Sequence, residues 1–212
     1  MQSDPLFLAF ELVILILSIV IHEVAHGYAA NSLGDPTARL QGRLTLNPLK
    51  HVDPVGSVLI PIFLVLTGAN ILFGWAKPVP YNPYNLSNKR WGEAIVSGAG
   101  VFTNLLIAIV LGLIARFGFG TLPDPFVQIA AMAAFVNLFL GLFNLVPLPP
   151  LDGYTFLRGI MPYRVSEALY AFEMRIRELG AAGILLVLFI FYYFLSGPFA
   201  LLVQYLFALL VG

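Results

Sequence analysis

The sequence contains no cysteine and little charge. Without cysteine the chain offers neither disulfides nor thiolate ligands, so any transition-metal site must be built from histidine, carboxylate and water. Lys and Arg together number 11, as do Asp and Glu, and charged residues make up only 10% of the 212 residues. This balanced charge gives no indication of a nucleic acid partner, and we expect none. No polar block is long enough for a separate soluble domain.

Apolar residues dominate what is present: 59% of the chain is hydrophobic and the mean hydropathy is +0.90. Several apolar stretches reach the roughly 20 residues needed to cross hydrocarbon. We therefore expect an all-α polytopic membrane protein with one integral membrane domain over residues 1–212. Residues 1–5 carry no Lys or Arg, so the first apolar stretch lacks the basic start of a cleavable signal peptide and should stay in the bilayer.

Apolar runs and helix breakers predict five to six transmembrane segments. The expected spans are 6–30, 91–116, 126–146, 181–195 and, barely long enough to cross, 199–211, with Ser196-Gly197-Pro198 separating the last two. The shorter apolar run over 55–75 is interrupted by polar and glycine residues, so a re-entrant segment fits it as well as a full span does.

Two shorter elements are expected between and after these spans. Alternating side chains over 38–46 predict a short strand or β-hairpin near the active site. Residues 164–179 predict an amphipathic helix on the membrane surface. Glu173 and Arg177 form an i,i+4 pair there, and we interpret that pair as part of a solvated face.

The motif His22-Glu23-Val24-Ala25-His26 lies inside the first apolar segment. In a helix the two histidines leave the same face one turn apart, so both imidazoles can bind one zinc ion. Glu23 is the candidate base that takes a proton from water. The simpler interpretation is a pair of hydrogen-bonded histidines, but ionisable residues inside membrane segments are costly and usually functional.

A zinc hydrolase typically has three protein ligands, so a third must come from elsewhere in the chain. The candidates are His51, Asp53, Glu93 and Asp152. The three prolines within 147–150 cannot continue a helix, so the chain unwinds there and presents Asp152, which favours this residue. His51 stays open as an alternative ligand, and a role in stabilising the turn stays open for Asp152.

The position of Asp152 beside the histidines would fix the topology. The third helix then runs opposite to the first and fourth, and 55–75 dips into the membrane and returns. Arg116 then lies on one side, and the other ten basic residues lie on the opposite side: Arg39, Arg43, Lys50, Lys77, Lys89, Arg90, Arg158, Arg164, Arg175 and Arg177. The positive-inside rule makes the crowded side, which carries the active site, cytoplasmic.

Five stretches of the chain carry a family resemblance. They are His22 to Gly27, residues 34–48, Asp53 to Ser57, Gly74 to Pro80, and Asn144 through Leu151-Asp152-Gly153. Together they resemble the site-2 protease family of intramembrane zinc metalloproteases. The similarity covers nearly the whole chain and is to compact prokaryotic members without PDZ or CBS domains.

The resemblance implies one zinc ion per chain, held by His22, His26 and Asp152, with Glu23 as general base. It implies hydrolysis of a peptide bond within or near the transmembrane segment of a membrane protein, in regulated intramembrane proteolysis. The catalytic core would cover about 6–153, with C-terminal membrane segments to 211. The location implied is a prokaryotic inner membrane.

Further site residues are expected beyond the zinc ligands. Asn104, Gly74 and Pro78 are the candidates for substrate binding, and His51 and Asn144 are the candidates for an auxiliary role. Asn104 ends the stretch Gly100-Val101-Phe102-Thr103-Asn104, where Val101 stands in place of the proline of the family motif.

Two other functions remain open at this point. A membrane transporter or channel would use intramembrane His and Asp to bind ions or relay protons, and broken segments such as 55–75 are typical of transporters, although the chain has no internal repeat. A catalytically silent relative would only bind membrane proteins, and the intact Glu23 argues against it. The expected partners are the lipid bilayer and a transmembrane protein or peptide substrate, with no oligomeric state indicated.

Overall fold

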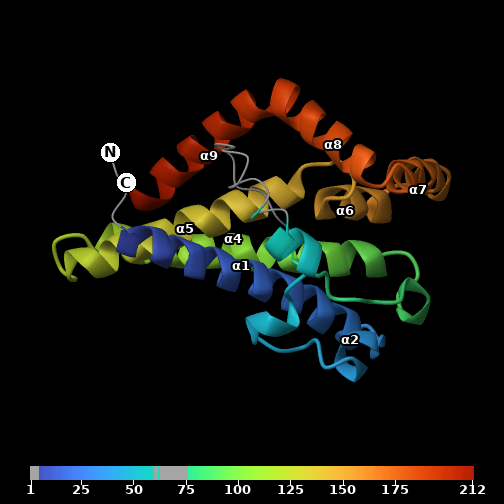
Figure 1. Cartoon of the computed structure of the whole chain (residues 1–212), viewed down its shortest axis with the longest axis horizontal. Coiled ribbons are helices and arrows are strands. Elements are labelled where there is room, and N and C mark those ends of the chain that lie inside the picture. Colours follow the sequence, from blue (N-terminus) through green and yellow to red (C-terminus); the bar gives the residue numbers. More distant parts are fainter. Residues whose placement is uncertain (1–4, 60–61, 63–75) are drawn as a thin grey trace.

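The computed structural model describes residues 5–59, 62 and 76–212. In this part of the chain every regular element is helical and no strand occurs. Three long helices, α1 (Pro5–Ser32), α4 (Gly92–Gly118) and α5 (Asp124–Leu145), form the body of the molecule. A bent arm crosses over α5 in Figure 1 and consists of α8 (Ala181–Ile190), η4 (Phe191–Leu195) and α9 (Ser196–Val211).

The directions of the three body helices agree with the predicted topology. In Figure 1, α1 and α5 run the same way and α4 runs opposite to both. The carboxyl end of α1 and the loop before α4 are joined by a hydrogen bond from Ser87 N–H to the Leu33 carbonyl, 2.7 Å long. Residues 33–91 therefore begin and end at one end of the body.

Small residues allow α4 to pack closely between its neighbours. Its buried positions are rich in glycine, alanine and serine, as its sequence predicts. A Cβ at Gly141 of α5 would lie 2.8 Å from Leu105 Cδ2 on α4, so the two helices approach at a position without a side chain. α4 is thus the central helix on which α1, α5 and α6 are arranged.

Among the described residues, four helical segments are long and apolar enough to cross a membrane: Ala9–Ser32, Gly92–Gly118, Asp124–Leu145 and Leu185–Val211. The expected spans 181–195 and 199–211 are one continuous segment, so the prediction of five to six spans is not confirmed. Ser196-Gly197-Pro198 does not end the helix because Pro198 lies in the first turn of α9, where no backbone N–H is needed. The π-type turn η4 accompanies the bend that Figure 1 shows there.

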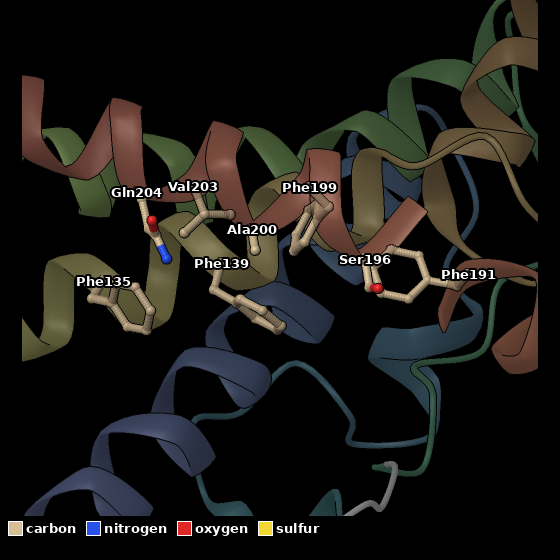
Figure 2. Close-up of a pocket in the computed structure, with 8 residues that line it drawn as sticks. All are labelled: Phe135, Phe139, Phe191, Ser196, Phe199, Ala200, Val203 and Gln204. Atoms are coloured by element: carbon tan, nitrogen blue, oxygen red, sulfur yellow. The ribbon is translucent and has the colours of Figure 1, made fainter. Parts of the chain in front are cut away.

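Aromatic side chains attach the arm to α5. The ring centroids of Phe139 and Phe199 lie 5.4 Å apart, and those of Phe143 and Phe191 lie 5.1 Å apart. Figure 2 shows an apolar cavity of about 230 Å³ beside these contacts. No residue proposed from the sequence as a site residue lines this cavity, so we assign it to packing.

The polar region after α1 folds differently from expectation. Instead of a strand or hairpin over 38–46, residues Thr37–Leu40 form the helical turn α2. The turn begins there because the Asp35 carboxylate accepts the Thr37 N–H at 3.3 Å and its hydroxyl at 2.6 Å. Gly42 reverses the chain with φ +63°, and Arg43 points inward to the Lys77 carbonyl, 2.8 Å away.

Short helices complete the part of the chain before α4. They are η1 (Pro48–Lys50), η2 (Pro54–Leu59) and η3 (Pro83–Asn85). Asp53 caps η2, since its Oδ1 accepts the N–H groups of Val55 at 3.0 Å and Gly56 at 2.6 Å. The re-entrant segment expected over 55–75 lies largely outside the described residues.

The chain unwinds over 146–151 as its prolines predict, and α6 (Asp152–Ile160) begins at Asp152. α7 (Tyr163–Glu178) is the expected amphipathic helix. The expected solvated face is wrong for Glu173, which is only 3% exposed. This side chain is buried because α7 packs on α6, where Arg158 lies 3.8 Å from it.

Candidate metal centre

The centre is built from two segments that are 130 residues apart in sequence. His22 and His26 leave one face of α1 one turn apart, and both are buried. Asp152 joins them from the amino end of α6. Asp152 Oδ2 lies 2.8 Å from His22 Nε2 and 3.2 Å from His26 Nε2, and the two ring nitrogens are 3.0 Å apart.

These three atoms fit the donor set of a zinc ion. A tetrahedral zinc site with bonds of about 2.0–2.1 Å has about 3.3 Å between neighbouring ligand atoms. The observed separations of 2.8–3.2 Å are close to that value. Two imidazoles and one carboxylate leave a fourth position for water or substrate, which is the arrangement of catalytic zinc sites.

Neighbouring backbone fixes how His26 presents its ring. His26 Nδ1–H donates to the Val96 carbonyl at 2.7 Å, which leaves the lone pair of Nε2 for a metal. Val96 belongs to α4, as does Gly100, which lies against both rings. A Cβ at Gly100 would be 2.6 Å from His26 Nε2 and 2.8 Å from His22 Cε1. The histidine pair therefore fits only against a glycine.

Hydrogen bonds determine the charge state of Asp152. Burial raises the pKa of its carboxyl group, but when the two imidazoles carry a proton on Nε2, their hydrogen bonds and positive charge outweigh burial and hold that pKa below its usual range. Asp152 is therefore a carboxylate, the form in which it can bind a metal.

Glu23 lies beside the two histidines, while Asp152 is the candidate for the third metal ligand. Ligand atoms of Glu23, His22 and His26 all lie within 4.8 Å of one another. The Glu23 Oε2 atom accepts the Val79 N–H at 2.8 Å. Pro78 and Pro80 flank Val79 and have no N–H, so Val79 provides the one backbone donor of this tripeptide.

Buried polar side chains hold the extended segment 76–81 against the site. Arg43 Nη2 donates to the carbonyls of Lys77 at 2.8 Å and Pro78 at 3.3 Å. The Lys77 N–H donates to the His51 carbonyl at 2.8 Å. Arg43 is only 6% exposed, so its pairing with this backbone is required to compensate the burial of its charge.

The other candidates for the third ligand have different partners. His51 Nε2 donates to the Thr45 carbonyl at 2.9 Å within its own loop. Asp53 caps η2, and Glu93 Oε2 forms an ion pair with Arg158 Nη2, 2.9 Å away. Among the described candidates, only Asp152 is brought to the histidine pair.

Asn104 and Asn144, which were proposed from the sequence, and Asn137 have distinct surroundings. Asn137 Nδ2 donates to Ser18 Oγ at 2.9 Å and joins α5 to α1, while Asn144 Nδ2 donates within its own helix to the Leu140 carbonyl at 3.0 Å. Asn104 is fully buried, and neither atom of its amide has a hydrogen-bond partner in the described part of the chain. It lies one turn beyond Gly100 on the same face of α4.

The two remaining sequence candidates are Gly74 and Pro78. Gly74 lies outside the described residues. Pro78 is exposed and immediately precedes Val79, so it lies beside Glu23.

Sequence reasoning missed the contacts made by Arg43, Val79, Gly100 and Arg158. Gly100 is one of several small residues in α4, and these indicate close packing by another helix. Its contact with the imidazoles could not be predicted, because it depends on how α1 crosses α4. The Pro-Val-Pro sequence at 78–80 could have indicated the role of Val79, since Val79 has the one backbone N–H of this tripeptide.

Known proteins resemble this chain in sequence. Residues 121–190 match the family model described as Peptidase family M50, a stretch that includes Asp152 but not the histidine pair. A Bacillus subtilis (strain 168) protein named "Putative zinc metalloprotease YwhC" is 44% identical, over 74% of this chain and 72% of that protein.

More distant relatives carry similar names. "Putative zinc metalloprotease Rip2" of Mycolicibacterium smegmatis is 32% identical, over 73% of this chain and 58% of that protein. "Zinc metalloprotease MJ0392" of Methanocaldococcus jannaschii is 26% identical, over 76% of this chain and 37% of that protein. No solved structure matches the chain at a significant level.

Proposed function

Since this chain belongs to peptidase family M50, the site-2 protease family of zinc metalloproteases, we propose that it is an intramembrane zinc metalloprotease. It hydrolyses a peptide bond within or near the transmembrane segment of a membrane protein, in regulated intramembrane proteolysis. The observation that carries the proposal is the convergence of His22, His26 and Asp152 within 3.2 Å of one another, beside Glu23.

The proposal gives each residue of the centre a role. His22 Nε2, His26 Nε2 and Asp152 Oδ2 hold one zinc ion per chain. When bound there, zinc supplies Lewis-acid chemistry, lowering the pKa of a water molecule and polarising the scissile carbonyl. Glu23 accepts the proton of that water on Oε1, because Oε2 is held by the Val79 N–H, and later donates it to the leaving nitrogen.

The substrate must lose its helical structure before its peptide bond can react. In a helix each carbonyl accepts a backbone hydrogen bond and is shielded by side chains. The extended segment 76–81 lies beside Glu23 and suits the docking of an unwound peptide by strand addition. We assign substrate contacts to Gly74, Pro78 and Asn104, since the Asn104 amide lies one turn from the metal centre without a partner in the described structure.

The proposal places the centre toward the cytoplasm of a prokaryotic cell, in the inner membrane. His22 and His26 lie in the carboxyl-terminal half of a candidate span. By the predicted topology, ten of the 11 basic residues lie on the same side of the membrane as the metal centre. The positive-inside rule therefore favours the cytoplasmic side for the centre. Lipid and a transmembrane peptide are the proposed partners.

Cleavage of a model transmembrane peptide tests the proposal. The purified protein with zinc is expected to cleave the peptide, and Glu23→Gln is expected to lower the rate by about 10²–10⁴-fold while the protein keeps its zinc. Glu11→Gln is the matched control, because Glu11 is an exposed residue of the same helix.

Cleavage by Glu23→Gln at the wild-type rate would contradict the assignment of the base. A wild-type protein that binds zinc but cleaves no membrane peptide, and that instead moves ions across vesicles, would favour a transporter.

A further inference from the structure

Arg158 is a buried charge at the junction of three helices. It lies on α6, six residues after Asp152, and is only 7% exposed. Its Nη2 forms an ion pair with Glu93 Oε2 of α4, the two atoms being 2.9 Å apart, and its Nε lies 3.8 Å from Glu173 Oε2 of α7. The guanidinium also lies over the ring of Tyr170, 5.0 Å from the ring centroid. A buried charge is tolerated only when it is paired, so both carboxylates are needed.

The amino end of α6 is seated on α5 and carries Asp152. Gly153 lies directly against the carbonyl of Leu145, where a Cβ would overlap the oxygen. Asp152 itself reaches out to the histidine pair from this end.

The carboxyl end of α6 is seated on α4 and α7. A Cβ at Gly159 would be 2.8 Å from the backbone nitrogen of Ala94, so the two helices meet at backbone distance. Contact with α7 at this end comes from Arg158 beside Glu173, and nearer the amino end of α6 Tyr154 donates its hydroxyl to the Leu169 carbonyl of α7 at 2.8 Å. α6 has nine residues, so a shift at its carboxyl end is transmitted to its first residue.

We propose that Arg158 is a positioning residue of the metal centre. By holding the carboxyl end of α6 between Glu93 and Glu173, it keeps the Asp152 carboxylate at the histidine pair. The inference rests on the proposed function, since it takes Asp152 as a zinc ligand. Glu93 and Glu173 then act on the centre through Arg158 and α6, without touching zinc or substrate.

The zinc affinity of the purified full-length chain tests this inference, measured by competition with a chelator. Arg158→Met keeps the apolar stem and removes the charge, and it is expected to weaken zinc binding about tenfold, as loss of partners behind metal ligands does. Arg158→Lys keeps a charge that can pair with Glu93 and is expected to stay within about threefold of wild type.

Arg177→Ala is the matched control. Arg177 pairs with the same Glu173 at 2.7 Å, but from within α7 and with a side chain that is 60% exposed. Its removal is expected to change the zinc affinity by less than about twofold. Should Arg158→Met fail to fold, Glu93→Gln removes the other half of the pair and is expected to weaken zinc binding about fivefold.

Cleavage at raised zinc concentration separates positioning from a general loss of stability. If Arg158 acts through Asp152, free zinc above the weakened dissociation constant restores cleavage by Arg158→Met. Wild-type zinc affinity in Arg158→Met, or lost cleavage that zinc does not restore, would overturn the inference alone. A wild-type chain that binds no zinc would overturn the proposed function, and the inference with it.

Discussion

The rings of His22 and His26 both lie against Gly100, and no side chain fits at that position. The ideal Cβ would be 2.6 Å from two atoms of the His26 ring and 2.8 Å from the His22 ring. Neither ring can retreat freely, because the Val96 carbonyl holds His26 and Asp152 lies against His22. The histidine pair depends on the absence of a side chain here.

Gly100→Ala is therefore expected to weaken zinc binding by at least about tenfold, because the added methyl group forces one imidazole ring away from the position where both Nε2 atoms bind the metal. Zinc competition on the purified protein measures the change. Gly98→Ala on the same helix is the control, since its Cβ would meet only the flexible rings of Phe102 and Phe156 at 3.1–3.4 Å. Wild-type affinity in Gly100→Ala would show that the rings do not need this contact.

Individual site residues were predictable where the signal is local. The spacing of His22, Glu23 and His26 and the prolines before Asp152 lie within short stretches. The roles of Arg43 and Arg158 were not predictable, because each depends on contacts between segments far apart in the chain. In the sequence both look like surface charges.

Asp35 joins two elements that flank the metal centre. Its buried carboxylate accepts hydrogen bonds from Thr37, from the Asn82 N–H at 2.7 Å and from Asn85 Nδ2 at 2.8 Å. It thereby ties the turn after α1 to η3 and to the end of segment 76–81. The helix that carries His22 and the segment that contacts Glu23 are fixed to each other by this residue.

Stability at acid pH tests this junction. Burial raises the pKa of Asp35, but the hydrogen bonds from Thr37, Asn85 and Asn82 lower it more, so the folded value lies below the ordinary one. The stabilisation is complete above the unfolded pKa of about 3.9 and is lost as pH falls through the folded pKa. Asp35→Asn is expected to lose about 1.5–3 kcal/mol at pH 7 and to depend less on pH below about pH 4.

Unfolding in mild detergent at a series of pH values measures both effects. Asp124→Asn, an exposed carboxylate at the start of α5, is the control and should behave like wild type. An Asp35→Asn protein with wild-type stability at pH 7 would show that the junction contributes little.

Helices were easier to predict than the segments between them. The apolar runs of α1, α4 and α5 exceed 20 residues, and their ends agree with the sequence to within about two residues. Over 38–46 the alternation of side chains was misleading, because Leu40 and Leu46 are exposed while Arg43 points inward to pair with backbone. Pro198 was misleading as a helix breaker because it lies in a first turn.

The orientation of the whole molecule can be tested without interference, because the chain has no cysteine of its own. Leu49 and Phe119 are 79% and 78% exposed, and the predicted topology puts them on opposite sides of the membrane. Leu49→Cys is expected to react with a membrane-impermeant maleimide only in inverted vesicles, and Phe119→Cys only in spheroplasts. The reverse pattern would place the metal centre on the outer side.

The ligand set of the bound metal tests the central claim most directly. Zinc K-edge X-ray absorption of the purified chain reports the number of imidazoles and the bond lengths. We expect one zinc per chain with two imidazole nitrogens and two oxygens at about 2.0–2.1 Å, and less bound zinc in Asp152→Ala. Three imidazoles would make His51 the third ligand, and an absence of imidazole scattering would contradict the assignment of His22 and His26.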